Sequence, residues 1–331
     1  MPLLISPFSP TFLPCIDEAL PCRYSGLGDC DLWRLPMNLT FAVCANVHQE
    51  PERQIADLAD QGVTALEGSH QPLLENEPAT LRRWRRLLEK AGMRYWSIHA
   101  PFGPDYNLAA PEPEKRQKAL ESIALTLERA AELGAAVVIV HAGVKVEKEE
   151  ERATVEERAL EGLATLVKVA ERAGVRLGLE NLLPQYPCER PEQLRRMVEA
   201  LNSPWLGVCF DTGHAHVGGN VLEFFQALAP WVITFHLQDN DRSRDLHLPP
   251  GYGTIPWEEF GSLLRSTGFT DPLVIEAPPW QRSNWSTLLR ETQALLTRGR
   301  WRLYDEQGET FARCTRCGHW RFHDEEGWFC A

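Results

Sequence analysis

From Leu39 onward, short apolar runs alternate with longer amphipathic segments along the chain. The apolar runs are rich in Val, Ile, Leu and aromatic residues, and they have the short length that is typical of strands buried in a parallel sheet. This pattern predicts strands at Leu39–Asn46, Val63–Gly68, Arg94–His99, Ala136–His141, Val175–Glu180, Leu206–Asp211, Val232–Leu237 and Leu273–Glu276.

The amphipathic segments between these runs predict helices. Four of them are followed directly by a glycine (Gly62, Gly92, Gly134 and Gly174), a residue that commonly ends helices because it enters the left-handed region without strain. The predicted helices are Pro51–Gln61, Ala79–Ala91, Glu114–Leu133, Thr154–Ala173, Pro191–Leu201, Val221–Leu228, Trp257–Thr267 and Ser283–Thr297.

Eight strand–helix units in about 260 residues predict an α/β protein with a (β/α)₈ (TIM) barrel. A doubly wound open sheet is the alternative, and it would normally place a glycine-rich phosphate turn after its first strand. The segment Cys44–Gln49 at that position contains no glycine, so the barrel is preferred. Residues 1–36 show no clean period and predict an irregular N-terminal extension. The barrel then covers residues 37–299, and residues 300–331 form a separate tail.

Composition excludes several classes of protein. We find no run of about 18 apolar residues, so no membrane span is predicted. No basic residue precedes the apolar start of the chain, which argues against a secretory signal and for a cytoplasmic enzyme. The net charge of −12 makes nucleic acid an unfavoured partner, because phosphate binding usually needs excess Lys and Arg. Nine scattered cysteines do not suggest a disulfide framework.

Imidazoles and carboxylates fall at or just after the carboxyl ends of six successive predicted strands. In a parallel barrel these ends meet in one mouth. Buried carboxylates at this density repel each other unless cations neutralise them. Imidazole and carboxylate ligands suit Zn²⁺, Mn²⁺, Fe²⁺ or Co²⁺, and we predict one to three such ions. The predicted ligands are His99, His141, Glu180, Asp211, His214, His236, Asp245, His247 and Glu276.

Five segments give residues of about 38–280 a resemblance to the xylose isomerase-like barrel superfamily. They are Ser97–Phe102, Gly178–Asn181, Phe210–His214, His236–Asp239 and Asp245–Gly253. The superfamily includes sugar isomerases and epimerases and the zinc-dependent apurinic endonucleases. Resemblance to the epimerases implies one metal held by Glu180, Asp211, His236 and Glu276. Resemblance to the endonucleases implies three zincs, with His99, His141 and a bridging Glu180 at one, and His214, Asp245 and His247 at another.

The resemblance favours an isomerase or epimerase of a small sugar, polyol or sugar phosphate. In that hypothesis the metal binds two substrate oxygens, Glu180 and Glu276 exchange a proton with the substrate carbon, and His214 binds a substrate oxygen or a further metal. The alternative is a phosphodiester hydrolase with two or three metals, which the complete ligand set supports. Against it, Ala142 replaces the endonuclease proline, and the turns are not notably basic. A binding protein without turnover is a third class, and a homo-oligomer is left open.

The tail carries a separate cysteine pattern. Cys314 and Cys317 form a Cys-x-x-Cys pair, and Cys330 follows after twelve residues. This is the spacing of a zinc ribbon without its last cysteine, so a histidine would have to complete a structural zinc site. His323 is preferred, because His319 follows Cys317 by only two residues. A disordered tail that binds no metal is the alternative.

Overall fold

The computed structural model describes residues 39–279 and 284–297 in full, and it describes the backbone of residue 298 and of four further strands between residues 301 and 330. The chain divides into two compact units. One is the unit Asn38–Gly299, and the C-terminal strands belong to the other. None of the helices in the described residues is long and apolar enough to cross a membrane.

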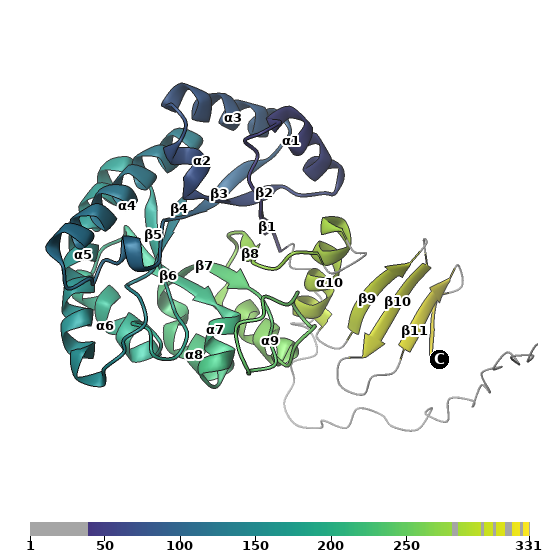
Figure 1. The fold of residues 1–331 in the computed structure, drawn as a ribbon. Coiled ribbons are helices and arrows are strands. Elements are labelled where there is room, and N and C mark those ends of the chain that lie inside the picture. Colours follow the sequence, from purple (N-terminus) through teal and green to yellow (C-terminus); the bar gives the residue numbers. More distant parts are fainter. Residues whose placement is uncertain are drawn as a thin grey trace, which may run out of the picture. The chain divides into compact units, whose positions relative to one another are not determined.

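The unit Asn38–Gly299 is a closed barrel of eight parallel strands in sequential order (Figure 1). Pairing of Ala42 with Val274 joins the last strand to the first and closes it. The strands are β1 Phe41–Cys44, β2 Ala65–Ser69, β3 Arg94–His99, β4 Val137–Val140, β5 Arg176–Glu180, β6 Leu206–Asp211, β7 Val232–Leu237 and β8 Leu273–Ile275. The predicted (β/α)₈ barrel is therefore confirmed.

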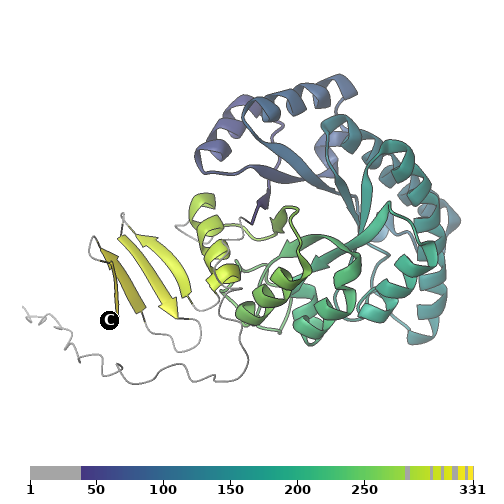
Figure 2. The ribbon, with the colours of Figure 1, turned by 180° about the vertical axis from the view of Figure 1, so that it is seen from behind.

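Helices surround the strands on the outside, as the two opposite views in Figures 1 and 2 show. The helices that the sequence predicted are α1 Pro51–Asp60, α3 Pro78–Lys90, α4 Pro113–Leu133, α5 Arg152–Ala173, α6 Pro191–Leu201, α8 Val221–Leu228, α9 Trp257–Thr267 and α10 Trp285–Arg298. Gly134 and Gly174 end α4 and α5 in the left-handed conformation, as expected. The structure has two further short helices that were not predicted, α2 His70–Leu74 and α7 Thr212–Gly218. Short 3₁₀ turns at Pro104–Tyr106, Glu149–Glu151 and Ala229–Trp231 were not predicted either.

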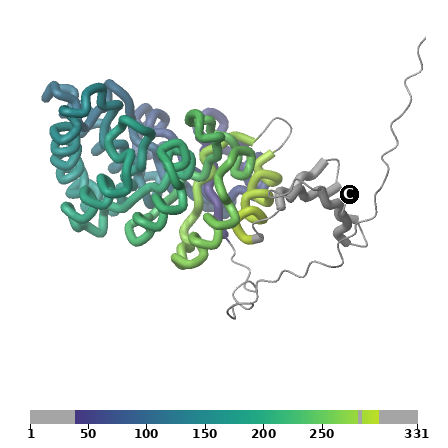
Figure 3. The backbone as a smooth tube through the Cα atoms, turned by 90° about the horizontal axis from the view of Figure 1, so that it is seen from below, coloured from purple at the N-terminus to yellow at the C-terminus, as the bar shows by residue number. Residues whose placement is uncertain are grey.

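In the tube of Figure 3, the purple N-terminal part of this unit lies close to its yellow-green C-terminal part. The backbone N–H of Trp285, at the start of α10, donates to Gln61 Oε1 after α1 at 3.0 Å. This bond ties the last helix of the ring to the first.

Alternation along the strands sends side chains to two separate cores. Outside the strands, Phe210 and Phe235 pack against Phe225 of α8 and Phe260 of α9, with ring centroids 5.1 to 6.3 Å apart. Inside the barrel, a smaller cluster contains Ala42, Ala65, Trp96, Val137, Ile139, Cys209 and Val274. Two positions after Ile139, Cys209 and Val274, the chain therefore points His141, Asp211 and Glu276 inward at the mouth.

The C-terminal strands form an antiparallel sheet in the order β12-β11-β10-β9, which the sequence analysis did not predict. They are β9 Trp301–Glu306, β10 Glu309–Cys314, β11 Trp320–Asp324 and β12 Gly327–Cys330. The register pairs His323 with Thr310, four residues before Cys314. Cys317 and His319 lie outside the described residues, so the zinc site stays a prediction.

Candidate metal centre

Four donor side chains meet at the centre of the barrel mouth, and we call them the central site. They are Glu180, Asp211, His236 and Glu276, whose ligand atoms lie within 4.8 Å of one another. His236 Nδ1 is 3.1 Å from Glu180 Oε1, 3.0 Å from Glu276 Oε2 and 4.0 Å from Asp211 Oδ2. They lie at or next to the carboxyl ends of the four successive strands β5 to β8. The closed barrel therefore brings them together at one mouth.

The charges of the central site fit a divalent cation. Three carboxylates converge on His236 Nδ1, which can donate only one hydrogen bond. Glu276 Oε2 is buried and has no hydrogen-bond partner of good geometry. Burial, and then the charges of Glu276 and Glu180, raise the pKa of Asp211 to about 7 against the opposing effect of His214. A bound cation would relieve this excess of negative charge, and an imidazole with three carboxylates suits Zn²⁺, Mn²⁺, Fe²⁺ or Co²⁺.

A second group shares Glu180 with the central site. Glu180 Oε2 lies 2.9 Å from His141 Nε2 and 3.5 Å from His99 Nε2, and these three ligand atoms also gather within 4.8 Å. The Phe102 ring packs against both histidines, with centroids 4.9 and 4.8 Å away, yet it is 56% exposed. The second group can therefore hold another ion beneath an aromatic surface at the mouth.

His214, Asp245 and His247 form a third group, connected in pairs. Asp245 Oδ2 is 2.9 Å from His247 Nε2 and 3.5 Å from His214 Nε2. A hydrogen bond with Asp245 raises the pKa of His247 to about 9. Against the effect of burial, the charge of Asp211 raises the pKa of His214 to about 10. These histidines hold protons that a bound cation would have to displace.

All nine ligands predicted in the barrel lie in this one network, where each is within 4.0 Å of another member. Their coordination of metal stays a prediction. The structure establishes that their side chains meet, and that Glu180 lies between the central site and the second group.

The loop after β7 carries two of these residues and is organised around Asp239. The buried Asp239 carboxylate accepts hydrogen bonds from Gly251 N at 2.9 Å, Ile255 N at 3.2 Å and Trp257 Nε1 at 2.7 Å. A Cβ atom at Gly253 would lie 2.3 Å from Asp239 Oδ1 and from a backbone oxygen, so the loop needs glycine there. This packing fixes the segment that presents Asp245 and His247.

Three residues of the site were missed from the sequence. Asn181 exchanges two hydrogen bonds with the backbone of Asp211, at 2.9 and 2.8 Å. Gln238 Nε2 donates to Asp245 Oδ1 at 2.6 Å. Glu67 is 4% exposed and lies against His236. Glu67 had a signal, because it lies two positions after Ala65 in a predicted strand and therefore on the same inward face.

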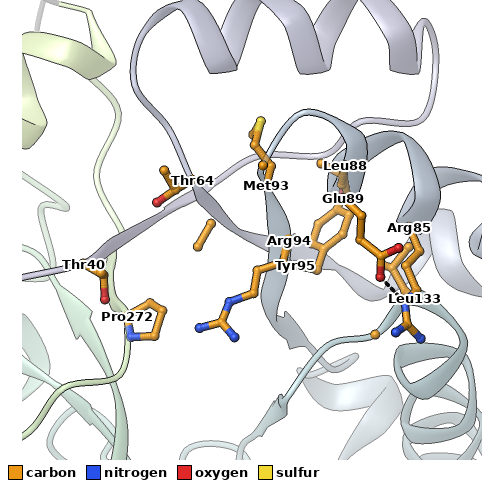
Figure 4. Close-up of a pocket in the computed structure, with 13 residues that line it drawn as sticks. Thr40, Thr64, Arg85, Leu88, Glu89, Met93, Arg94, Tyr95, Leu133 and Pro272 are labelled. Carbon is orange, nitrogen blue, oxygen red and sulfur yellow. Dashed lines mark hydrogen bonds and ion pairs between the residues drawn. The ribbon is translucent and has the colours of Figure 1, made fainter.

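A cavity of about 540 Å³ lies at the opposite end of the strands (Figure 4). Thr40, Thr64 and Pro272 line it from the amino ends of strands or the residues before them. Its one carboxylate, Glu89, is paired with Arg85 at 2.8 Å. Active sites of TIM barrels form at the carboxyl ends instead, so this cavity is separate from the metal centre.

Comparison with known proteins agrees with this architecture. The chain is 33% identical to the Methanocaldococcus jannaschii protein MJ1311 over 186 residues, which are 54% of this chain and 63% of that protein. It is 26% identical to the probable endonuclease 4 of Mycoplasmoides gallisepticum over 201 residues, 55% of this chain and 64% of that one. The chain thus matches less than two thirds of the length of either relative.

Among solved structures, the crystal structure of a D-tagatose 3-epimerase-like protein is similar, with a TM-score of 0.68 and 25% identity. The similarity covers 79% of this chain and 99% of that one. The family model described as xylose isomerase-like TIM barrel matches residues 55–298, well over half of the chain. The chain therefore belongs to the xylose isomerase-like TIM barrel family.

Proposed function

We propose that this protein is a metal-dependent isomerase or epimerase of a small sugar, polyol or sugar phosphate. The observation that carries the proposal is the central site, where Glu180 and Glu276 approach the same ring nitrogen of His236 from two different strand ends. A substrate bound at this point lies between two carboxylates that can exchange a proton with it. The D-tagatose 3-epimerase-like neighbour, covered over 99% of its length, supports a sugar as substrate.

A divalent ion in the central site would bind two neighbouring substrate oxygens and stabilise negative charge that develops on them. The chain's own part is the movement of the proton. Although burial opposes it, the charge of His236 lowers the pKa of Glu276 to about 2. Glu276 is therefore ionised at neutral pH and can act as the base. Phe102, exposed beside His99 and His141, offers an apolar surface to one face of a sugar.

Phosphodiester hydrolysis is the second candidate, because a specific observation favours it. The group of His99, His141 and Glu180 can hold a second ion beside the central site, and paired metal ions stabilise the attacking and leaving oxygens of a phosphodiester. The endonuclease 4 relative supports this alternative. The net charge of −12 is unfavourable for a polyanionic substrate.

Metal stoichiometry and isotope exchange separate the two candidates. Protein purified without added metal is analysed for elemental content and then incubated in D₂O with a panel of ketoses, their phosphates and a chromogenic phosphodiester. One tightly bound metal per barrel and deuterium incorporation next to the carbonyl are expected. Glu276→Gln, which keeps the side-chain shape, should abolish the exchange. Two or three metals with phosphodiester cleavage and no exchange would overturn the proposal in favour of the hydrolase.

A further inference from the structure

Glu67 is a buried carboxylate inside the barrel that belongs to neither of the groups gathered for metal binding. It lies on β2, behind His236 as seen from the central site. Glu67 Oε1 and Oε2 are 3.0 and 3.2 Å from His236 Nε2. Ser97 Oγ donates to Glu67 Oε2 at 2.6 Å and holds the carboxylate in place.

This contact determines which nitrogen of His236 can offer a lone pair to a cation in the central site. An ionised carboxylate has only acceptor lone pairs, so Nε2 must carry the hydrogen that Glu67 accepts. Nδ1 is then the nitrogen left to coordinate a cation. It is also the atom on which Glu180, Glu276 and Asp211 converge.

Three of the other four histidines of the network have a neutral partner on one ring nitrogen. Nδ1 of His99, His214 and His247 lies 2.8 to 2.9 Å from backbone carbonyl oxygens, those of Ala100, Asn181 and Glu276. His236 is 0% exposed and has a carboxylate instead. A charged acceptor holds the ring more firmly and makes the opposite nitrogen a stronger electron donor.

We propose that Glu67 is a positioning residue, which fixes the tautomer and orientation of His236 so that Nδ1 binds the metal of the central site. Ser97 and Glu67 form a buried relay that runs from β3 through β2 to the His236 ligand on β7. The inference rests on the proposed metal at the central site, but it concerns metal affinity and does not depend on which reaction is catalysed.

The test measures metal binding by the full-length metal-free protein. Co²⁺ is titrated in competition with a chromophoric chelator, and the visible spectrum of bound Co²⁺ reports its coordination. Glu67→Gln keeps the shape and an acceptor oxygen but removes the charge, so its affinity for Co²⁺ should fall about 10-fold. Glu67→Ala should lose about 100-fold, the upper end for an outer-shell partner of a metal ligand, and should shift the spectrum.

Glu156 provides a matched control. It is also a buried glutamate, 8% exposed, but it lies on the outer helix α5 and pairs with Gln193 and Arg196. Glu156→Gln should leave Co²⁺ affinity within twofold of wild type, even if it lowers thermal stability. A purely structural role for Glu67 predicts the same behaviour in Glu67→Gln.

Affinity within twofold of wild type in Glu67→Gln would overturn the proposal, and this variant decides alone if Glu67→Ala does not fold. If wild type itself binds no Co²⁺, the positioning role and the metal-dependent function both fail. If Co²⁺ binds and depends on Glu67 but no substrate exchanges its proton, only the proposed function fails.

Discussion

Replacing Asp239 with Ala tests how the loop after β7 is held. The change removes the acceptor of four donors: the backbone N–H groups of Asn240, Gly251 and Ile255, and Trp257 Nε1. A buried donor left without a partner costs about 1 to 3 kcal/mol. Because a loop at the barrel mouth can relax toward water, we take about 1 kcal/mol each and expect a loss of roughly 4 kcal/mol in the free energy of unfolding.

Asp239→Asn should destabilise the protein less than Asp239→Ala does. The amide keeps one acceptor oxygen and places an NH₂ group where the other oxygen accepts from Gly251 and Trp257. We therefore expect it to lose about half as much, roughly 2 kcal/mol. Urea unfolding followed by tryptophan fluorescence measures both variants, and elemental analysis measures their metal content. Asp245 and His247 lie on the loop that Asp239 anchors, so if the third group holds a metal ion, its occupancy should decrease in the same order.

Asp241 is the control, since it is an exposed aspartate two residues along the same loop. Its carboxylate accepts hydrogen bonds from Ser243 in the same turn, so Asp241→Ala should unfold near the urea concentration of wild type. A loss below about 1 kcal/mol in Asp239→Ala would refute the reasoning, because it would mean that the four donors find water as readily as they find the carboxylate.

Glu180→Ala removes the carboxylate shared by two groups, so the metal bound by the barrel should be lost and only the zinc predicted in the tail should remain, while circular dichroism shows an intact barrel. Normal metal content would show that the ligand assignment is wrong. In metal-free protein the pKa values of His214 and His247 are raised to about 10 and about 9. Their contribution to stability is complete below about pH 6.5 and should be lost as the pH rises through 9 to 10, which urea unfolding measures. Metal binding should release protons below that range. Deletion of residues 300–331 should remove one equivalent of zinc without loss of turnover, and unchanged zinc would exclude the tail site. A chain beginning at Met37 should fold and stay active; loss of solubility would show that the removed segment packs on the barrel.

The sequence was sufficient to predict the barrel and most of the side chains that meet at its mouth. Every predicted strand is present, because a buried parallel strand needs a continuous apolar run that stands out against amphipathic helices. The predicted ligands meet because they follow parallel strands whose carboxyl ends share one edge. Once the sheet closes into a barrel, the carboxyl ends of all its strands lie around the same mouth.

What the sequence did not show depends on contacts between distant residues. Helix α7 has only seven residues, too few for a helical period, and it begins where Asp211 Oδ1 accepts from His214 N at 2.6 Å. In the sequence, Asp239 resembles any loop aspartate. Its role depends on a hydrogen bond from Trp257, which lies eighteen residues later in the chain. Glu67 lies in the middle of β2 and not at its carboxyl end, so the polar residues that follow the strands do not point to it. Strand alternation alone places it inward.

The position of Glu180 links the number of metals to the kind of chemistry. Its Oε1 faces the central site and its Oε2 faces His141 of the second group. With one metal in the central site, the second oxygen can take up a proton from a substrate carbon. With a further ion at His99 and His141, both oxygens would be engaged by cations, and neither would be available to exchange a proton with a substrate. The same residue can therefore serve an epimerase or a bridged metal cluster, but it cannot serve both at once. We therefore expect occupancy of the second group to distinguish the two candidate functions.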